Sequence, residues 1–379
     1  FPEDVTLSCA FSDATATATR VSPTELRCAA PPSKDMQTAN FSLIFNGVVT
    51  ATDLSYSYVR SALLAALRPR SGAVGGGTAV TVTGLNFFDT DALACRFGNV
   101  DVEALWISDR EIECEAPAHA EGAVGVRVSL NGQDYSEDAL EFAYNPAITL
   151  GDGVSPRSGP SVGGTVVVVK GSGFEFSPDL RCRFGWTESD AKFVSSTEVL
   201  CISPTHDAES VAVAVSNNGQ DFVGGSGAIF VFEAPPVVSS IEPSLGATAG
   251  STVVVVRGSG FTGTLACIFG EVPALKVDHV SETEVACTAP AHAALESVVV
   301  SVSVNGVDYA ASATHFRYVV APEVLSVDPT AGQGGAVTVV RGLNFIDSSE
   351  LVCRFGATVT TARWISSTEL ECESASGEA

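Results

Sequence analysis

The sequence predicts an all-β chain made of tandem two-sheet sandwiches, and three observations carry this prediction. Its ten cysteines fall into five pairs, whose members lie 19 or 20 residues apart and whose first members advance by 85 to 87 residues. A fixed period of this kind marks an internal repeat. Within each period, valine-rich runs alternate with glycine, proline and Asn-Gly, and helical spacing never persists. The pairs are Cys9 with Cys28, Cys95 with Cys114, Cys182 with Cys201, Cys267 with Cys287, and Cys353 with Cys372.

Three recurring elements follow one another in each period. A nearly continuous β-branched run ending in glycine predicts a strand that is covered on both sides or lies at the centre of a sandwich. A later run alternates strictly, as in Val124, Val126 and Val128, and predicts a strand with one buried face. It ends in Asn-Gly, which predicts a two-residue hairpin, and an aromatic strand then closes the unit. The β-branched runs are 78–84, 165–171, 252–258 and 336–342, and the aromatic strands are 142–144, 230–232 and 316–318.

Units of about 86 residues with about seven short strands fit a sandwich of immunoglobulin type. Short connections that contain proline behave as stiff spacers, so we expect an elongated rod with an incomplete sandwich at each end. The predicted domains are repeat 1 (1–60), which lacks its first strands, repeats 2, 3 and 4 (61–146, 147–234 and 235–320), and repeat 5 (321–379), which lacks its last strands.

The amino-acid sequence of the repeats resembles that of a known family. "SPRSGPSVGGTVVVVKGSGFEFSPDLRCRFG" followed by "SSTEVLCISP" is similar to the IPT/TIG repeat, the immunoglobulin-like domain of plexins, hepatocyte growth factor receptor and fibrocystin-type ectodomains. The resemblance covers essentially the whole chain, although Gly250-Ser251-Thr252 replaces Gly-Gly-Thr in repeat 4. It implies an extracellular adhesion or recognition module, and it fixes no ligand.

Composition and motifs exclude several classes of function. Forty-four acids against twenty bases give a net charge of −24, which repels phosphate backbones, so we expect no nucleic-acid partner. No stretch approaches the ~20 apolar residues of a membrane-spanning helix. We also expect no enzymatic activity or catalytic residue, because no Ser/His/Asp pattern with a nucleophile elbow occurs, and no metal site, because CxxC and Cys/His zinc spacings are absent. We expect no cofactor, because the glycine clusters at 75–77 and 163–164 precede strands instead of the helices of a phosphate loop.

The even number of regularly spaced cysteines favours disulfides in an oxidising, extracellular or cell-surface compartment. The alternative is a set of buried free thiols. Closing a loop of this length stabilises a unit by about 3 kcal/mol on the chain-entropy model.

Histidines and tryptophans supply candidate contact residues. His119, His206 and His292 each follow the second cysteine of a complete unit by five residues, with acids close by. They are candidates for a pH-sensitive contact, or else they are solvated loop residues. Trp106 and Trp364 share a position that is Phe193, His279 or Arg20 in the other repeats. We predict a partly exposed contact position, with packing under a neighbouring loop as the alternative.

Three other motifs predict local structural roles or sites of modification. A glutamate stands three residues before each second cysteine, where a turn or capping role is favoured over ligand binding. Asn40-Phe41-Ser42 is a candidate N-glycosylation site, or a chance tripeptide on a strand. The alternating threonines at 15, 17 and 19 favour a strand over O-glycosylation. The glutamates are Glu25, Glu111, Glu198, Glu284 and Glu369.

The terminal repeats suggest how copies assemble. Alignment of Cys9 with Cys353 leaves repeat 1 without counterparts of 322–344, and repeat 5 stops at the counterpart of residue 35. Half-sandwiches expose apolar faces and unpaired strand edges. We therefore expect self-association, in which strand addition between incomplete ends builds a head-to-tail extracellular filament. The alternative is a fragment of a longer cell-surface adhesion or receptor ectodomain that binds proteins or glycans.

Overall fold

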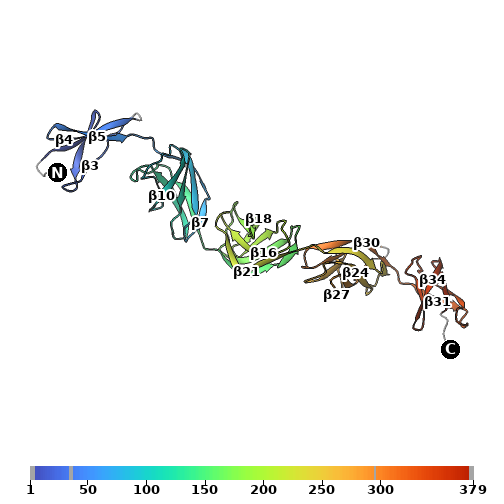
Figure 1. Cartoon of the computed structure of the whole chain (residues 1–379). Helices are drawn as coiled ribbons and strands as arrows, with labels where there is room; N and C mark the ends of the chain where they lie inside the picture. Colours follow the sequence, from blue (N-terminus) through green and yellow to red (C-terminus); the bar gives the residue numbers. More distant parts are fainter. Residues whose placement is uncertain (1–4, 34–36, 294–295, 375–379) are drawn as a thin grey trace. The chain divides into compact units, whose positions relative to one another are not determined.

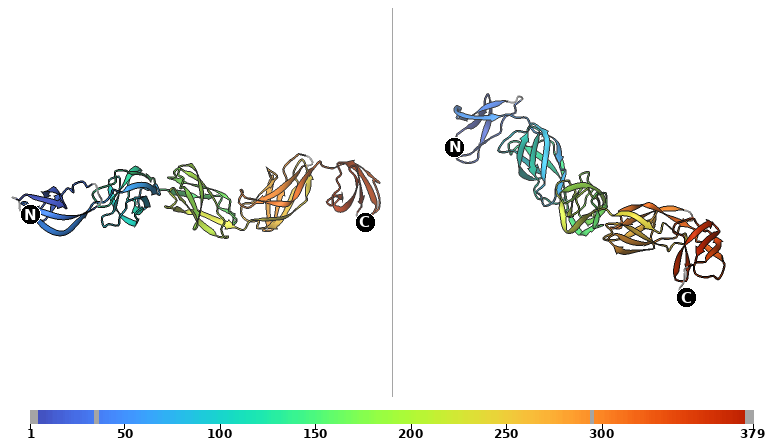
Figure 2. Two further views of the ribbon diagram at one scale, coloured as in Figure 1. Left: turned by 90° about the horizontal axis from the view of Figure 1, so that it is seen from above. Right: turned by 45° about the vertical axis from the view of Figure 1, so that its right-hand side comes forward.

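The protein is built from β-strands throughout the residues that its computed structural model describes, 5–33, 37–293 and 296–374 (Figure 1). The all-β prediction is confirmed. Phe1 and Ala379, the ends of the two repeats predicted to be incomplete, lie outside these residues. The chain separates into two compact units, residues 1–147 with repeats 1 and 2 and residues 148–379 with repeats 3 to 5. Each repeat forms its own stack of strands (Figures 1 and 2).

Repeat 2 shows the complete sandwich. Its strands are β6 (Leu63–Arg68), β7 (Ser71–Ala73), β8 (Ala79–Leu85), β9 (Ala94–Phe97), β10 (Val100–Ser108), β11 (Glu111–Glu115), β12 (Gly122–Ser129) and β13 (Leu140–Asn145). One sheet has the order β6-β8-β11-β10, and the other has the order β9-β12-β13-β7 with β7 parallel to β13. The long strand β10 pairs with β9 through its first half and with β11 through its second half, so it joins the two sheets.

Repeat 3 has the same topology. Its strands are β14 (Thr149–Ser155), β15 (Ser158–Pro160), β16 (Val166–Ser172), β17 (Arg181–Phe184), β18 (Thr187–Ser195), β19 (Glu198–Ile202), β20 (Ser210–Ser216) and β21 (Val223–Glu233). They pair in the order β14-β16-β19-β18-β17-β20-β21-β15.

Repeat 4 breaks the joining strand in two. Its strands are β22 (Val237–Glu242), β23 (Leu245–Ala247), β24 (Val253–Ser259), β25 (Ala266–Phe269), β26 (Val272–Pro273), β27 (Lys276–Ser281), β28 (Glu284–Thr288), β29 (Ser297–Ser303) and β30 (Tyr309–Val319). Ala274 N–H still donates to Cys267 O at 2.9 Å beyond Pro273, and one extra residue between the cysteines separates β26 from β27. The sandwich therefore resolves into a four-stranded and a five-stranded sheet. This is the repeat with the longer cysteine spacing.

Within the described residues, the terminal repeats hold five strands each. Repeat 1 contains β1 (Leu7–Phe11), β2 (Ala14–Arg20), β3 (Leu26–Cys28), β4 (Thr38–Phe45) and β5 (Val48–Ser57), paired in the order β3-β2-β1-β4-β5. Repeat 5 contains β31 (Glu323–Asp328), β32 (Val337–Leu343), β33 (Val352–Phe355), β34 (Thr358–Ser366) and β35 (Glu369–Glu373), paired in the order β31-β32-β35-β34-β33. The threonines at 15, 17 and 19 lie on β2, as expected. The proposed domain boundaries all fall between the last strand of one repeat and the first of the next.

Each core is organised around a disulfide. All five predicted cysteine pairs are bonded, and the described residues hold no free cysteine, so the alternative of buried free thiols is wrong. In the complete repeats, both cysteines of each pair belong to the buried apolar core. The bonded pairs are Cys9 with Cys28, Cys95 with Cys114, Cys182 with Cys201, Cys267 with Cys287, and Cys353 with Cys372.

The β-branched runs are interior strands of their sheets, but only one of their faces is buried. Val80 and Val82 of β8 are fully buried, whereas Val166, Val253 and Val337 at the starts of β16, β24 and β32 are exposed. The expectation of cover on both sides is wrong, because the outer face of each of these sheets is exposed to solvent.

The glycine that ends each run allows a close approach of backbones. A Cβ on Gly84 would overlap the carbonyl oxygen of Leu63 on the neighbouring strand and the ring of Phe87. Gly171, Gly258 and Gly342 have the same surroundings. The Gly-x-x-Phe motif therefore records a steric requirement of the fold.

The predicted two-residue Asn-Gly hairpin occurs in repeat 1 alone among the described repeats. There Asn46 and Gly47 both have positive φ, 48° and 78°, and join β4 directly to β5. In the complete repeats the loop is longer and the asparagine side chain organises it. The Oδ1 atom of Asn131, for example, accepts the backbone N–H groups of Gln133 and Asp134. The prediction is wrong for these repeats because an Asx turn replaces the primed turn.

Candidate functional site

The position shared by Trp106 and Trp364 varies among the repeats and lies at the open edge of one sheet. Trp106 pairs directly with buried Ile112 of β11, so its side chain lies on the core side of the sheet. Phe193, His279, Trp364 and Arg20 occupy the same register against Val199, Val285, Leu370 and Leu26. The shared position inferred from the cysteine spacing is therefore confirmed.

Both tryptophans are held by the same hydrogen bond. Trp106 Nε1 donates to the carbonyl of Phe87 at 3.3 Å, and Trp364 Nε1 donates to the carbonyl of Phe345 at 3.2 Å. The indoles remain 38% and 37% exposed, respectively. Each ring is thus packed under a neighbouring loop and also presents part of its surface to solvent.

The accepting loop has a sequence signature that the cysteine alignment did not reveal. The two repeats with tryptophan read Gly-Leu-Asn-Phe after the β-branched run, and repeats 3 and 4 read Gly-Ser-Gly-Phe. Asn86 and Asn344 adopt positive φ, 65° and 62°, in the place of that glycine. Their side chains donate to Ser61 O and Ala321 O, respectively, which fastens the loop to the start of the repeat.

The strand that carries this position is unpaired along its other side. The second half of β10 pairs with β11 alone among the described strands, and β18, β27 and β34 behave in the same way. An aliphatic residue follows the variable position and is exposed in every repeat. We call residues 105–107, 192–194, 278–280 and 363–365 the variable edge of their repeats. The exposed aliphatic residues are Ile107, Val194, Val280 and Ile365, with Val21 as their counterpart in repeat 1.

Repeat 3 has exposed aromatics that the sequence reasoning missed. Trp186 follows Gly185 in the turn between β17 and β18 and is 92% exposed, and Phe176 is 84% exposed. The available signal was the position of Trp186 directly after the Cys-x-Phe-Gly motif, where a hairpin turn projects into solvent.

The three recurring histidines brace the end of each complete repeat. The backbone N–H of His119, His206 and His292 donates to Val74 O, Ser161 O and Thr248 O, respectively. Their rings stack on Tyr144, Phe232 and Tyr318, with centroids 4.7 to 4.9 Å apart and interplanar angles of 14 to 23°. The solvated-loop alternative is therefore wrong for the rings, which pack on core aromatics. A pH-sensitive contact stays a prediction.

The charged neighbours of these histidines differ between repeats. His292 Nδ1 lies 3.2 Å from Glu296 Oε2, and His206 Nδ1 lies 3.6 Å from Glu209 Oε1. His119 Nδ1 lies 2.9 Å from the carbonyl oxygen of Ala120. Among the residues that the structure describes, no group of three or more His, Cys, Asp or Glu side chains could hold a metal ion.

Three of the recurring glutamates, Glu25, Glu284 and Glu369, form ion pairs, and serine takes the capping role. In the turn before each glutamate, a serine hydroxyl accepts a backbone N–H, as Ser281 does from Thr283. Glu284 pairs with Arg257 at 3.0 Å, and Glu369 pairs with Arg341 at 3.4 Å. These pairs are partly exposed and contribute little to stability.

Asn40 is exposed on β4, opposite Ser55 of β5. Its backbone N–H donates to the hydroxyl of Ser12 at 3.1 Å. An exposed asparagine in an Asn-x-Ser tripeptide keeps glycosylation as a prediction.

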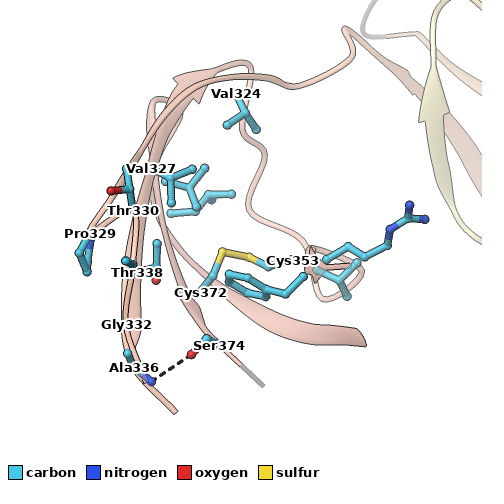
Figure 3. A pocket seen from close by; sticks show the side chains of 16 residues that line it. Val324, Val327, Pro329, Thr330, Gly332, Ala336, Thr338, Cys353, Cys372 and Ser374 are labelled. Carbon is cyan, nitrogen blue, oxygen red and sulfur yellow. Dashed lines mark hydrogen bonds between the residues drawn. A yellow bond between two sulfur atoms is a disulfide. The ribbon is translucent and has the colours of Figure 1, made fainter. Parts of the chain in front are cut away.

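Repeat 5 leaves the inner face of its sheet open. A cavity of about 750 Å³ is lined by Val327, Val340, Leu370, Phe355 and the disulfide between Cys353 and Cys372 (Figure 3). In repeat 4 the corresponding face packs against the sheet of β29 and β30. The cavity is thus the interior of a sandwich, and it offers no convergent polar groups of the kind that mark a ligand site.

None of the described residues forms a helix long and apolar enough to cross a membrane.

Comparison with known proteins places these features in a family context. A sequence model of the IPT/TIG domain matches residues 63–144, 152–232, 236–318 and 322–379. Human fibrocystin-L is 28% identical over 302 residues, which are 77% of this chain and 7% of that protein. Human plexin-A3 is 27% identical over 206 residues, 51% of this chain and 11% of that protein. The chain therefore spans about a tenth or less of these relatives. The full extracellular region of plexin A4 aligns with 98% of this chain and 39% of its own, at 15% identity and a TM-score of 0.39.

Proposed function

The chain belongs to the IPT/TIG domain family, and from this premise we propose that it is part of a cell-surface receptor or adhesion ectodomain that binds other proteins. Its similarity to fibrocystin-L and plexin-A3 supports this proposal. Five disulfides suit an extracellular compartment, where thiols are oxidised. In this proposal the chain acts by binding and has no enzymatic activity.

The variable edge is the observation that carries the proposal. Five repeats hold one backbone register at this place, and they fill it with Trp, Phe, His, Trp and Arg. The exposed aliphatic neighbour and the unpaired strand edge lie beside it. Partly buried tryptophans with fixed orientation are frequent hot spots in protein interfaces, and open strand edges accept extended segments.

The test is a binding screen of the purified chain against an array of purified extracellular proteins, with a glycan array in parallel. Trp106→Ala and Trp364→Ala should weaken protein binding at least tenfold, a loss of about 1.4 kcal/mol. Trp186→Ala is the matched control, because that side chain is exposed and stands in the turn before β18, outside residues 192–194. Equal loss in the control, or binding to glycans alone, would overturn the proposed contact.

The finer prediction, a head-to-tail filament, has no support in these similarities, which favour the ectodomain. The observation that motivates the filament prediction is the open inner face of the sheet in repeat 5. Light scattering over a wide concentration range tests it. Growth of the particle mass with concentration would support strand exchange, and a constant monomer mass would exclude it.

A further inference from the structure

Two junctions within residues 148–379 are bridged in the same chemical way. At each one, an acidic side chain of the following repeat accepts hydrogen bonds from residues of the preceding repeat. From these contacts we infer that carboxylate caps lock repeats 3, 4 and 5 into one stiff segment. This inference does not depend on which partner the chain binds.

The junction between repeats 3 and 4 is centred on Asp308. The hydroxyl of Thr165 donates to Asp308 Oδ2 at 2.7 Å. Asn305 Nδ2 donates to the same oxygen at 2.7 Å and to the carbonyl of Ser158 at 2.8 Å. Two side chains of repeat 4 therefore contact the backbone and a hydroxyl of repeat 3.

Both sides of this contact are also held within their own repeats. Thr165 is fully buried, and its backbone N–H donates to the hydroxyl of Ser203 at 3.0 Å. Gly159 lies so close to the Thr165 hydroxyl that any larger residue would displace it. Within repeat 4, Asn305 Oδ1 accepts the N–H groups of Val307 and Asp308 at 3.0 and 2.9 Å. Because donor and acceptor are preorganised, the contact costs little conformational entropy.

The surroundings restrict motion further. The connection between the two repeats contains Pro235 and Pro236, which lack the backbone freedom of other residues. A narrow pocket of about 210 Å³ remains beside them, lined also by Val162 and Tyr309. A hinge at this place would have to break the hydrogen bonds of Asp308 and Asn305.

The junction between repeats 4 and 5 uses Glu350. Its Oε1 atom accepts the backbone N–H of Ser244 at 2.9 Å and the Ser244 hydroxyl at 3.0 Å. The backbone N–H of Glu350 donates to the hydroxyl of Ser348 at 3.1 Å, which orders the loop that carries it. The chemistry matches that of Asp308, although the acid comes from a different loop of the sandwich.

Pulsed electron spin resonance on the full chain tests the lock at the first junction. Genetically encoded spin labels, which leave the disulfides untouched, would replace exposed Glu188 in repeat 3 and Glu271 in repeat 4. Thr165→Val removes only the hydroxyl, and Asp308→Ala removes the acceptor. Each should at least double the width of the distance distribution. Thr165→Ser, which keeps the hydroxyl, should retain the original width.

Asp134→Ala is the matched control. Asp134 accepts from Asn131 in the same loop of repeat 2 as Asp308 does from Asn305 in repeat 4. The distribution between repeats 3 and 4 should not change in this variant. Combining Thr165→Val with Asp308→Ala should broaden the distribution no more than Asp308→Ala alone, because Asp308→Ala already removes the hydrogen bond that Thr165→Val removes. Unchanged widths in the single variants, or additive broadening in the double variant, would overturn the inference.

A second label pair tests Glu350. With labels at Glu271 and exposed Ala357 of repeat 5, Glu350→Ala should broaden the distribution, whereas Glu350→Gln keeps the accepting oxygen and should not. Equal behaviour of the alanine and glutamine variants would remove Glu350 from the proposed lock.

Discussion

Replacing Tyr144 with phenylalanine should stabilise repeat 2, because the change removes a hydroxyl that is buried at a cost. Tyr144 is 1% exposed, and its hydroxyl has no hydrogen-bond partner among the residues that the structure describes. The ring stacks on His119 and contacts Phe142 edge-on at 5.1 Å. Repeat 3 has Phe232 at this position and keeps the same stack on His206. The ring alone therefore supplies the packing.

The expected change in the free energy of unfolding has two contributions, the unpaired hydroxyl and the ionisation of Tyr144 at high pH. An unsatisfied buried polar group costs about 1 to 3 kcal/mol, so we expect a gain of about 1 kcal/mol near neutral pH. Burial also raises the pKa of Tyr144 to about 12. Above pH 10 the unfolded state loses this proton while the folded state keeps it, so the free energy of unfolding falls as the pH rises. At pH 11 the loss is about 1.4 kcal/mol, and Tyr144→Phe abolishes it.

The assay is urea unfolding followed by the fluorescence of Trp106, which lies in the same repeat. Substituting Trp186 and Trp364 with phenylalanine leaves Trp106 as the single tryptophan. The advantage of Tyr144→Phe should widen between pH 8 and pH 11. The reciprocal change, Phe232→Tyr, should destabilise repeat 3, as read by native-state hydrogen exchange of the amides of its core strands. A destabilised Tyr144→Phe variant, or an advantage that does not change with pH, would refute the reasoning.

Three further predictions concern the framework and its modification. Gly84→Ala should lower the stability of repeat 2 by about 3 kcal/mol in urea unfolding, because its Cβ would overlap a backbone carbonyl of β6, whereas Gly75→Ala, with open space around it, should be tolerated. Replacing Cys95 and Cys114 together by alanine should cost repeat 2 about 3 kcal/mol, and an unchanged denaturation midpoint would count against the entropic account of the disulfide. Asn40→Gln should abolish a mobility shift on glycosidase treatment of chain secreted from mammalian cells, and wild-type chain with no such shift would remove Asn40 as a glycan site.

Much of the fold could be predicted because the same sequence pattern occurs in several copies. The cysteine period alone aligns the copies, and the alignment places Trp106, Phe193, His279 and Trp364 in one register. The disulfides follow from the same arithmetic. Local side-chain chemistry escaped this reasoning. The Asn-Gly dipeptide looks the same in all loops, but whether it forms a primed turn or an Asx turn depends on the residues after it.

The histidine stack was unpredictable for a related reason. His119 and Tyr144 are 25 residues apart, and their contact depends on how the last strand returns beside the loop after β11. Pattern reasoning treats the histidine as a loop residue, since its neighbours in sequence are polar or small. Only the packing of the two sheets shows that the ring covers a core aromatic.

Comparison of the repeats within this chain distinguishes positions where the fold requires one type of residue from positions where the residue differs. Gly84 and its counterparts recur because a larger residue would collide with the neighbouring backbone. The histidines recur in the complete repeats because their rings cover a core aromatic. At the variable edge, one register holds indole, phenyl, imidazole and guanidinium groups. In the proposed function, the differences in the side chains that the repeats present there are the source of specificity.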